Sequence, residues 1–375
     1  MKSLNNPFVI YGYKGAEYFC DRVNEVESII NALENERNIT LIAPRRIGKT
    51  GLIHRVFEEI RSKSTGTECF YLDILSTRNL DQFVELMAQS ILGQLDTTSQ
   101  AAMRKITTLL GSLRPTLTFD QISGKPTLSV DIARGQGEQS LRDIFEYLKQ
   151  SGKRCYIAID EFQQITKYPE QQTEALLRSY IQFIPDVYFI FAGSRQHMMT
   201  EMFLSAKRPF YLSSQMISLS PIDRGVYRNF ANRFFKASGR EISASDFDFL
   251  YDTVDGQTWY VQAILNRLFQ YSTEMIDREL IAKCIEELVQ EQSQFFENYY
   301  ALLTDNQALL LKSIAQEGRV HSPMAQSFAA KHHLPALSSI KMALDHLIDK
   351  QLVCRHDDAY VVYDRFFGKW LAGRH

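Results

Sequence analysis

One eight-residue segment restricts the folds open to this chain more than any other part of its sequence. It reads Ala43-Pro44-Arg45-Arg46-Ile47-Gly48-Lys49-Thr50. The apolar run 38–43 predicts a buried strand, and the apolar residues spaced through 52–60 predict an amphipathic helix. A tight loop between a strand and the start of a helix turns backbone N–H groups toward an anion. The segment therefore predicts a phosphate-binding loop in an α/β fold.

The residue types at the end of this loop have separate expected tasks. Lys49 is expected to reach the β- and γ-phosphates of a nucleotide, and the Thr50 hydroxyl is expected to bind Mg²⁺. The residues expected to bind the nucleotide are Pro44, Arg45, Arg46, Ile47, Gly48, Lys49, Thr50 and Gly51. Ala43 stands where the usual pattern has its first glycine, which is tolerable if the backbone there does not need a positive φ. The side chains of Arg45 and Arg46 either contact phosphate or are solvated, and the pattern leaves both open.

A second segment places acids at the end of an apolar strand. The run 155–159 is followed directly by Asp160 and Glu161. At a strand tip, Asp160 is placed to hold the Mg²⁺ shell and Glu161 to accept a proton from an attacking water. Two solvated acids after a strand are common, but their combination with the upstream loop favours the catalytic interpretation.

Short apolar strands alternate with amphipathic helices through the first part of the chain. The strand candidates are 38–43, 69–75, 155–159, 187–191 and 216–219. Continuous apolar strands of this kind are typical of a parallel sheet covered on both faces. Helical patterns at 83–91 and 106–113 precede the segment 115–137, which reads as an inserted β-hairpin. We therefore expect an α/β P-loop NTPase core over residues 1–222.

After residue 222 the pattern changes twice. Residues 223–303 carry helical patterns without strand runs, which predicts an all-helical lid domain. From residue 304, three short helical patterns are followed by two strand runs that flank 356–358 as a hairpin would. Three helices followed by a hairpin are the layout of a winged helix, which we assign to residues 304–375.

Composition excludes several classes of protein. The 375 residues include 42 Lys or Arg and 44 Asp or Glu, a formal net charge of −2, so no large basic field is available for nonspecific contact with nucleic acid or anionic lipid. The five cysteines have no paired spacing, which argues against a disulfide framework or a zinc module and favours a reducing cytoplasm. Without a signal-peptide pattern or a long apolar run, we expect neither export nor contact with a membrane.

These motifs resemble those of the P-loop ATPases of the AAA+ and STAND groups, most closely the family often called archaeal ATPases. The segment 44–50 matches that family's loop, and Asp160-Glu161-Phe162-Gln163 is similar to its Walker B signature. Residues 19–25, Phe-Cys-Asp-Arg-Val-Asn-Glu, resemble the family's opening motif near the adenine, with Asp21 where Gly is usual. The resemblance covers almost the whole chain and implies that Arg22 belongs to the nucleotide site.

The resemblance implies roles for residues outside the loop. Ser194 stands at the position of the family's polar sensor, which reaches the γ-phosphate or the water; a plain turn hydroxyl is the alternative. Arg208 stands where a basic residue approaches the nucleotide of a neighbouring subunit, so it is a candidate arginine finger, with a solvated arginine as the alternative. The turn at 255–257 corresponds to a lid motif near the adenine, but its His-Pro is absent, so we favour core packing for Trp259 and Tyr260.

Three functions are compatible with these residues. We favour a Mg²⁺-dependent ATPase that acts as a molecular switch, in which ATP or ADP sets the position of the lid and winged helix, with a homo-oligomer formed on ATP binding and an unidentified protein partner. The second is an ATP-controlled DNA-binding regulator, but the expected recognition helix is nearly neutral because it carries both Lys341 and the acids Asp345 and Asp349. The third is a nucleotide binder that turns over slowly, because of Ala43 and the altered lid motif.

Overall fold

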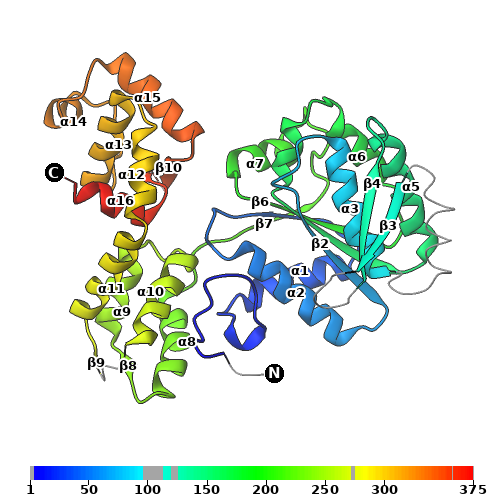
Figure 1. Cartoon of the computed structure of the whole chain (residues 1–375), viewed down its shortest axis with the longest axis horizontal. Helices are drawn as coiled ribbons and strands as arrows, with labels where there is room; N and C mark the ends of the chain where they lie inside the picture. The colour runs from blue at the N-terminus through cyan, green and yellow to red at the C-terminus, as the bar shows by residue number, and fades with distance from the viewer. Residues whose placement is uncertain (1–3, 96–112, 120–125, 272–274, 357, 375) are drawn as a thin grey trace. The chain divides into compact units, whose positions relative to one another are not determined.

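The computed structural model describes residues 4–95, 113–119, 126–271, 275–356 and 358–374 (Figure 1). They form two compact units. The first is Tyr11–Ile222, and the second combines the residues before Tyr11 with Asp223–His375. The chain therefore passes from the second unit into the first and back again.

A parallel five-stranded sheet forms the centre of the first unit (Figure 1). Its strands are β1 (Ile39–Ile42), β2 (Thr67–Asp73), β5 (Arg154–Asp160), β6 (Val187–Gly193) and β7 (Gln215–Ser218). Their order is β2-β5-β6-β1-β7, and every neighbouring pair runs parallel. The strands expected from the five apolar runs are thus confirmed. The strand before the phosphate-binding loop, β1, lies inside the sheet, so the loop begins from a fixed point.

Helices cover both faces of this sheet, as the apolar strands predict. On one face lie α1 (Val23–Glu34) and α2 (Lys49–Lys63), which share a core cluster with Ala158. On the other face lie α3 (Leu80–Leu95), α5 (Gly137–Ser151), α6 (Thr173–Ile181) and α7 (Gln196–Leu204). Their cluster includes Ile157, the neighbour of Ala158 on β5. Consecutive residues of one strand thus enter opposite layers, which explains the unbroken apolar runs.

The expected hairpin insert is present. Strands β3 (Leu113–Phe119) and β4 (Pro126–Ile132) pair antiparallel, and β4 contributes the fully buried Val130 to the core that includes α3. The helical pattern expected at 106–113 is wrong at its end, because Leu113 begins β3. Residues 106–112 and 120–125 lie outside the described residues.

The lid region is almost entirely helical. It contains α8 (Arg224–Lys236), α9 (Ala244–Thr253), α10 (Thr258–Gln270), α11 (Arg278–Glu291) and α12 (Ser293–Ala301). Aspartate and serine side chains accept backbone N–H groups at the starts of α8, α9 and α11, which satisfies donors that a helix start leaves unpaired. The structure adds a two-residue parallel pair, β8 (Glu241–Ile242) and β9 (Met275–Ile276), to a region expected to be all-helical. Two residues carry too little periodicity for a sequence pattern to reveal them.

The residues before Tyr11 pack on this helical region. The Phe8 ring is fully buried and contacts the rings of Phe234, Phe235 and Phe269, with centroids 5.1–5.8 Å apart. The Asn266 amide donates to the Phe8 carbonyl at 2.7 Å. The sequence boundary at 1–222 therefore differs from the structural one, because the aromatic contacts of Phe8 join distant parts of the chain.

The C-terminal region has the expected winged-helix order. Its elements are α13 (Asp305–Glu317), α14 (Gln326–Lys331), α15 (Leu337–Asp349), β10 (Val353–His356), β11 (Ala359–Val362) and α16 (Arg365–Ala372). A capping box between Thr304 and Gln307 fixes the start of α13. Strands β10 and β11 pair antiparallel as the wing hairpin. This region and the lid belong to one compact unit.

Candidate nucleotide-binding site

The loop 43–48 connects β1 to the first residue of α2, Lys49. Ala43 is fully buried, has no positive φ, and donates its N–H to the Gly193 carbonyl at 3.2 Å. A methyl group is therefore compatible with this position, and glycine is not required. Positive φ angles occur further along, at Arg46 (69°) and Gly48 (96°). For Arg46 the left-handed backbone costs about 1–2 kcal/mol, whereas Gly48 adopts it freely.

Lys49 links the loop to the two acids at the end of β5. Its side chain is 7% exposed, and its ammonium bonds to Asp160 Oδ1 and, at 3.1 Å, to Glu161 Oε1. The loop segment and the acidic segment, which lie more than a hundred residues apart in the sequence, are thus joined by the ammonium group of Lys49. A phosphate group offers the same kind of anionic oxygen, so Lys49 can exchange a carboxylate for a phosphate at little cost in charge pairing.

Asp160 is held by donors on both of its oxygens. Oδ1 accepts from Lys49 and from the Glu161 N–H, while Oδ2 accepts from Thr50 Oγ1 and from the Tyr71 hydroxyl, each at 2.9 Å. Burial alone would raise the pKa of Asp160, but the charge of Lys49 and these hydrogen bonds outweigh it and lower the pKa. Asp160 is therefore a carboxylate, and Thr50 is an exposed residue whose hydroxyl is bonded to it. Hard oxygen donors of this kind fit Mg²⁺.

Glu161 has a strained backbone and a well-held side chain. Its φ is 58°, in the left-handed region that non-glycine residues seldom adopt. Oε2 accepts from Ser194 Oγ at 2.7 Å and from Gln163 Nε2 at 2.5 Å. Burial opposes ionisation, but the charge of Lys49 and the bonds from Ser194 and Gln163 lower the pKa of Glu161. The side chain is thus a carboxylate with donors on both of its oxygens.

Arg22 contacts the loop from the opening motif. Its side chain is buried, and it donates to the Ile47 carbonyl at 3.3 Å and to Glu25 Oε1 at 2.8 Å. Asp21 and Arg22 both have positive φ, 55° and 66°. The glycine usual at position 21 in similar sequences is explained by this left-handed backbone, which Asp tolerates better than most residues. In this structure the side chain of Arg22 supports the loop by bonding to the backbone carbonyl of Ile47.

Arg208 is bound within its own unit. Its guanidinium pairs with Glu174 of α6 at 2.5 Å and lies 3.8 Å from Glu201 of α7. Among the described residues, the ion-pair partners of Arg208 are Glu174 and Glu201. Arg208 is therefore not part of the group that the structure brings together, which consists of Lys49, Thr50, Asp160, Glu161 and Ser194. The candidate finger role requires Arg208 to leave Glu174.

The two rings of the lid turn pack as favoured from the sequence. Tyr260 is fully buried, its ring lies 4.8 Å from that of Phe366, and its hydroxyl accepts the Arg365 N–H at 3.0 Å. The Trp259 ring also contacts Phe366, with centroids 6.1 Å apart. Both rings therefore connect the lid to the winged helix.

Sequence reasoning missed two side chains of the site. Tyr71 comes from β2, a strand separated from β5 by more than eighty residues, so only the strand order reveals that it reaches Asp160. Gln163 stands inside the quoted acidic motif, but no pattern indicated that its amide bonds to Glu161. Burial raises the pKa of Tyr71, and Asp160 raises it further, so the phenol remains a hydrogen-bond donor.

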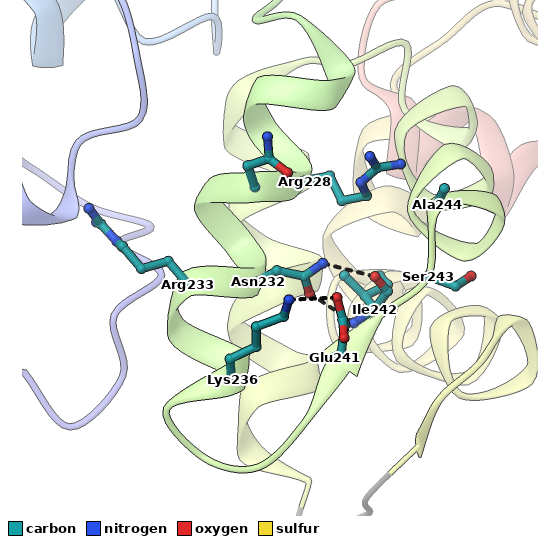
Figure 2. A pocket seen from close by; sticks show the side chains of 9 residues that line it. Arg228, Asn232, Arg233, Lys236, Glu241, Ile242, Ser243 and Ala244 are labelled. Carbon is teal, nitrogen blue, oxygen red and sulfur yellow. Dashed lines mark hydrogen bonds and ion pairs between the residues drawn. The ribbon is translucent and has the colours of Figure 1, made fainter.

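A separate pocket of about 470 Å³ lies in the second unit (Figure 2). It is lined by Arg228, Asn229, Asn232, Arg233, Lys236, Glu241, Ile242, Ser243 and Ala244. The Asn232 side chain bonds to both backbone groups of Ile242, and Lys236 pairs with Glu241 at 2.9 Å. Arg233 extends away from the other side chains (Figure 2). These polar groups fix β8 against α8, and we assign no ligand to the pocket.

The fold and the phosphate-binding loop define the class of this protein as an ATP-binding P-loop ATPase. The family model described as "ATPase domain predominantly from Archaea" matches residues 19–264, and the model described as "Probable winged helix domain" matches residues 294–373. The chain therefore belongs to this ATPase family, which confirms the resemblance and the fold class expected from the sequence.

Individual relatives agree with this assignment. An ATP-binding protein of Methanocaldococcus jannaschii is 23% identical over 285 residues, which cover 67% of this chain and 70% of the relative. The Walker-type ATPase of Pyrococcus abyssi has a similar structure, with a TM-score of 0.66 at 16% identity, covering 97% of this chain and 99% of that one. The ORC2 protein of Aeropyrum pernix has a TM-score of 0.57 at 14% identity, covering 96% and 94%. The two structures show a shared fold.

Among the described residues, no helix has both the length and the apolar character needed to cross a membrane.

Proposed function

We propose that this protein hydrolyses ATP in a Mg²⁺-dependent reaction and acts as a switch that couples nucleotide state to the helical and winged-helix unit. The observation that carries the proposal is the convergence of Lys49, Thr50, Asp160, Glu161 and Ser194 at one end of the sheet. These are the groups that phosphoryl transfer to water requires: a cation for the phosphates, hard oxygens for the metal and a base.

Each residue has a distinct role in this proposal. Thr50 and Asp160 would hold Mg²⁺, which supplies charge neutralisation of the β- and γ-phosphates. Lys49 would turn from the acids to the phosphates, and Glu161 would then accept the proton of the attacking water. Ser194 and Gln163 hold Glu161 Oε2, so the base keeps its orientation when Lys49 leaves Oε1.

The second unit supports the switch part of the proposal. Arg365 at the start of α16 bonds to Asp255 in the lid turn, and Tyr260 of α10 accepts the Arg365 N–H. These contacts make the lid and the winged helix one body, so a movement of the lid carries the winged helix with it. We propose ATP and ADP as ligands, a homo-oligomer on ATP binding, and a protein as the partner of the winged helix.

Two variants test the proposal. Lys49→Ala should abolish detectable Mg²⁺-ATP binding, because it removes the cation that both phosphates share. Glu161→Gln should keep the affinity and lower turnover about 100-fold or more, because an amide cannot accept the proton of water. Binding is measured with a fluorescent ATP analogue and turnover by phosphate release, with the exposed Glu146→Gln on α5 as a control. Equal loss of binding in both variants would contradict the division of roles.

A further inference from the structure

Tyr71 reaches the metal-binding carboxylate from the neighbouring strand. In the register of β2 and β5, Tyr71 pairs with Ala158, and Asp73 pairs with Asp160. Because alternate residues of a strand point to the same face, Tyr71 lies on the same face as Asp160, two residues back along the strands. Its hydroxyl donates to Asp160 Oδ2 at 2.9 Å.

The same oxygen accepts the hydroxyl of Thr50, also at 2.9 Å. Asp160 Oδ2 thus lies between a residue in the first turn of α2 and a residue of β2. The other oxygen, Oδ1, depends on Lys49 and on the Glu161 N–H. When Lys49 turns toward phosphate, Oδ1 loses its charged donor, and the orientation of the carboxylate rests more heavily on Oδ2.

The ring of Tyr71 is held by α2. His54 lies one turn after Thr50 on that helix, and its ring contacts that of Tyr71 with centroids 4.7 Å apart. Tyr71 is partly buried and packs against the core cluster that joins α1 and α2 to the sheet. The hydroxyl therefore has a fixed direction, set by the ring packing between helix and sheet.

We propose that Tyr71 is a positioning residue that fixes Asp160 for Mg²⁺ binding. This inference rests on the proposed Mg²⁺-ATP site. Loss of a hydrogen bond to a group that holds a metal reduces metal affinity about 10-fold or more. The nucleotide phosphates are bound by Lys49 and the loop backbone, which Tyr71 does not touch, so affinity for ATP without metal should not change.

The test separates these two affinities. Binding of a fluorescent ATP analogue is measured with EDTA and then across a Mg²⁺ titration, for the wild type and for Tyr71→Phe, which keeps the ring and removes the hydroxyl. We expect equal binding in EDTA and a Mg²⁺ concentration at half-saturation raised about 10-fold in the variant. Tyr156→Phe is the matched control, because Tyr156 is a buried tyrosine of the same core cluster on β5, and it should behave as the wild type.

A second variant guards against a folding defect. Tyr71→Met also lacks a donor and keeps apolar volume, so it should show the same shift in Mg²⁺ dependence. A wild type whose ATP binding ignores Mg²⁺ would overturn the proposed function. Two results would overturn the role of Tyr71 alone, in a wild type whose ATP binding responds to Mg²⁺. In the first, both Tyr71 variants have the same Mg²⁺ dependence as the wild type. In the second, both variants lose as much affinity for the ATP analogue in EDTA as they lose in Mg²⁺.

Discussion

Arg365 of the winged helix and Asp255 of the lid turn form an ion pair inside the second unit, with Nε 2.9 Å from Oδ2. The Arg365 side chain is 8% exposed and that of Asp255 is 21% exposed. The same carboxylate also pairs with Arg319 at 2.8 Å, but that side chain is 47% exposed. Asp255 thus has one buried arginine partner and one solvated arginine partner, so the contributions of the two ion pairs to stability can be compared at the same acid.

We predict that Arg365→Met destabilises the second unit much more than Arg319→Met does. Removing Arg365 leaves Asp255 with the solvated Arg319 alone and leaves the buried Val362 carbonyl without its donor, which together cost about 2 kcal/mol. Removing the exposed partner costs less than about 1 kcal/mol. Urea unfolding followed by tryptophan fluorescence measures both, since Trp259 and Trp370 lie in this unit. Equal losses would show that burial does not distinguish the two pairs.

A second prediction concerns the pH dependence of stability. In the wild type the pKa values of Asp160 and Glu161 lie below their ordinary 3.8 and 4.5, so their stabilising contribution is present above these values and is lost as pH falls through the lower folded values. In Lys49→Ala the counter-charge is gone and burial raises both pKa values. Ionised buried carboxylates then destabilise the fold at high pH, and protonation relieves this cost as pH falls.

The stability deficit of Lys49→Ala should therefore be largest near about pH 7 and should shrink toward about pH 5. Urea unfolding of the wild type and the variant across this range measures it. Lys207→Ala is the control, because Lys207 is exposed, and its small deficit should not depend on pH. A Lys49→Ala deficit that is constant or grows toward pH 5 would mean that Lys49 does not control the two acids.

The sequence predicted the sheet, the winged helix and the acids of the site because each rests on a local pattern. Apolar runs predicted five strands, and the residue types after β1 and β5 predicted Lys49, Thr50, Asp160 and Glu161. Tyr71 and Arg365 could not be predicted in this way, because their partners lie on elements far away in the chain. The packing of Phe8 against the lid helices could not be predicted either, since a single aromatic residue in a short segment has no periodicity to read.

A third prediction treats Arg208 as a proposed finger that acts on a neighbouring copy. Arg208→Ala should bind ATP normally and lose the part of the activity that rises with protein concentration in the wild type. Because Glu174 holds Arg208 at 2.5 Å, Glu174→Gln should loosen it and shift that rise to lower concentration. Specific activity is measured against dilution, with Lys207→Ala as control. A wild-type rate per chain that stays flat on dilution, in a protein that remains monomeric, removes the finger role.

The last prediction is that the winged helix binds DNA weakly, which favours a protein as its partner. Residues 321–375 contain seven Lys or Arg and five Asp, an excess of two positive charges. On α15 the exposed side chains include Asp345, Asp349 and the apolar Met342, which is 64% exposed. At the wing, Arg355 is paired with Asp358 at 3.3 Å, so its charge is partly neutralised.

Tight duplex binding draws much of its affinity from cations that neutralise phosphates and release counterions, and these surfaces supply few. Fluorescence anisotropy with a mixed-sequence duplex at about 150 mM salt should therefore show binding weaker than about micromolar, with or without ATP. Lys341→Glu, on the exposed face of α15, should change this weak signal little. Sub-micromolar binding that responds to ATP and disappears in Lys341→Glu would reverse this conclusion and favour an ATP-controlled DNA-binding protein. Such a result would mean that the cation presented by α15 is itself a DNA contact, because reversing its charge would set a carboxylate against the phosphates.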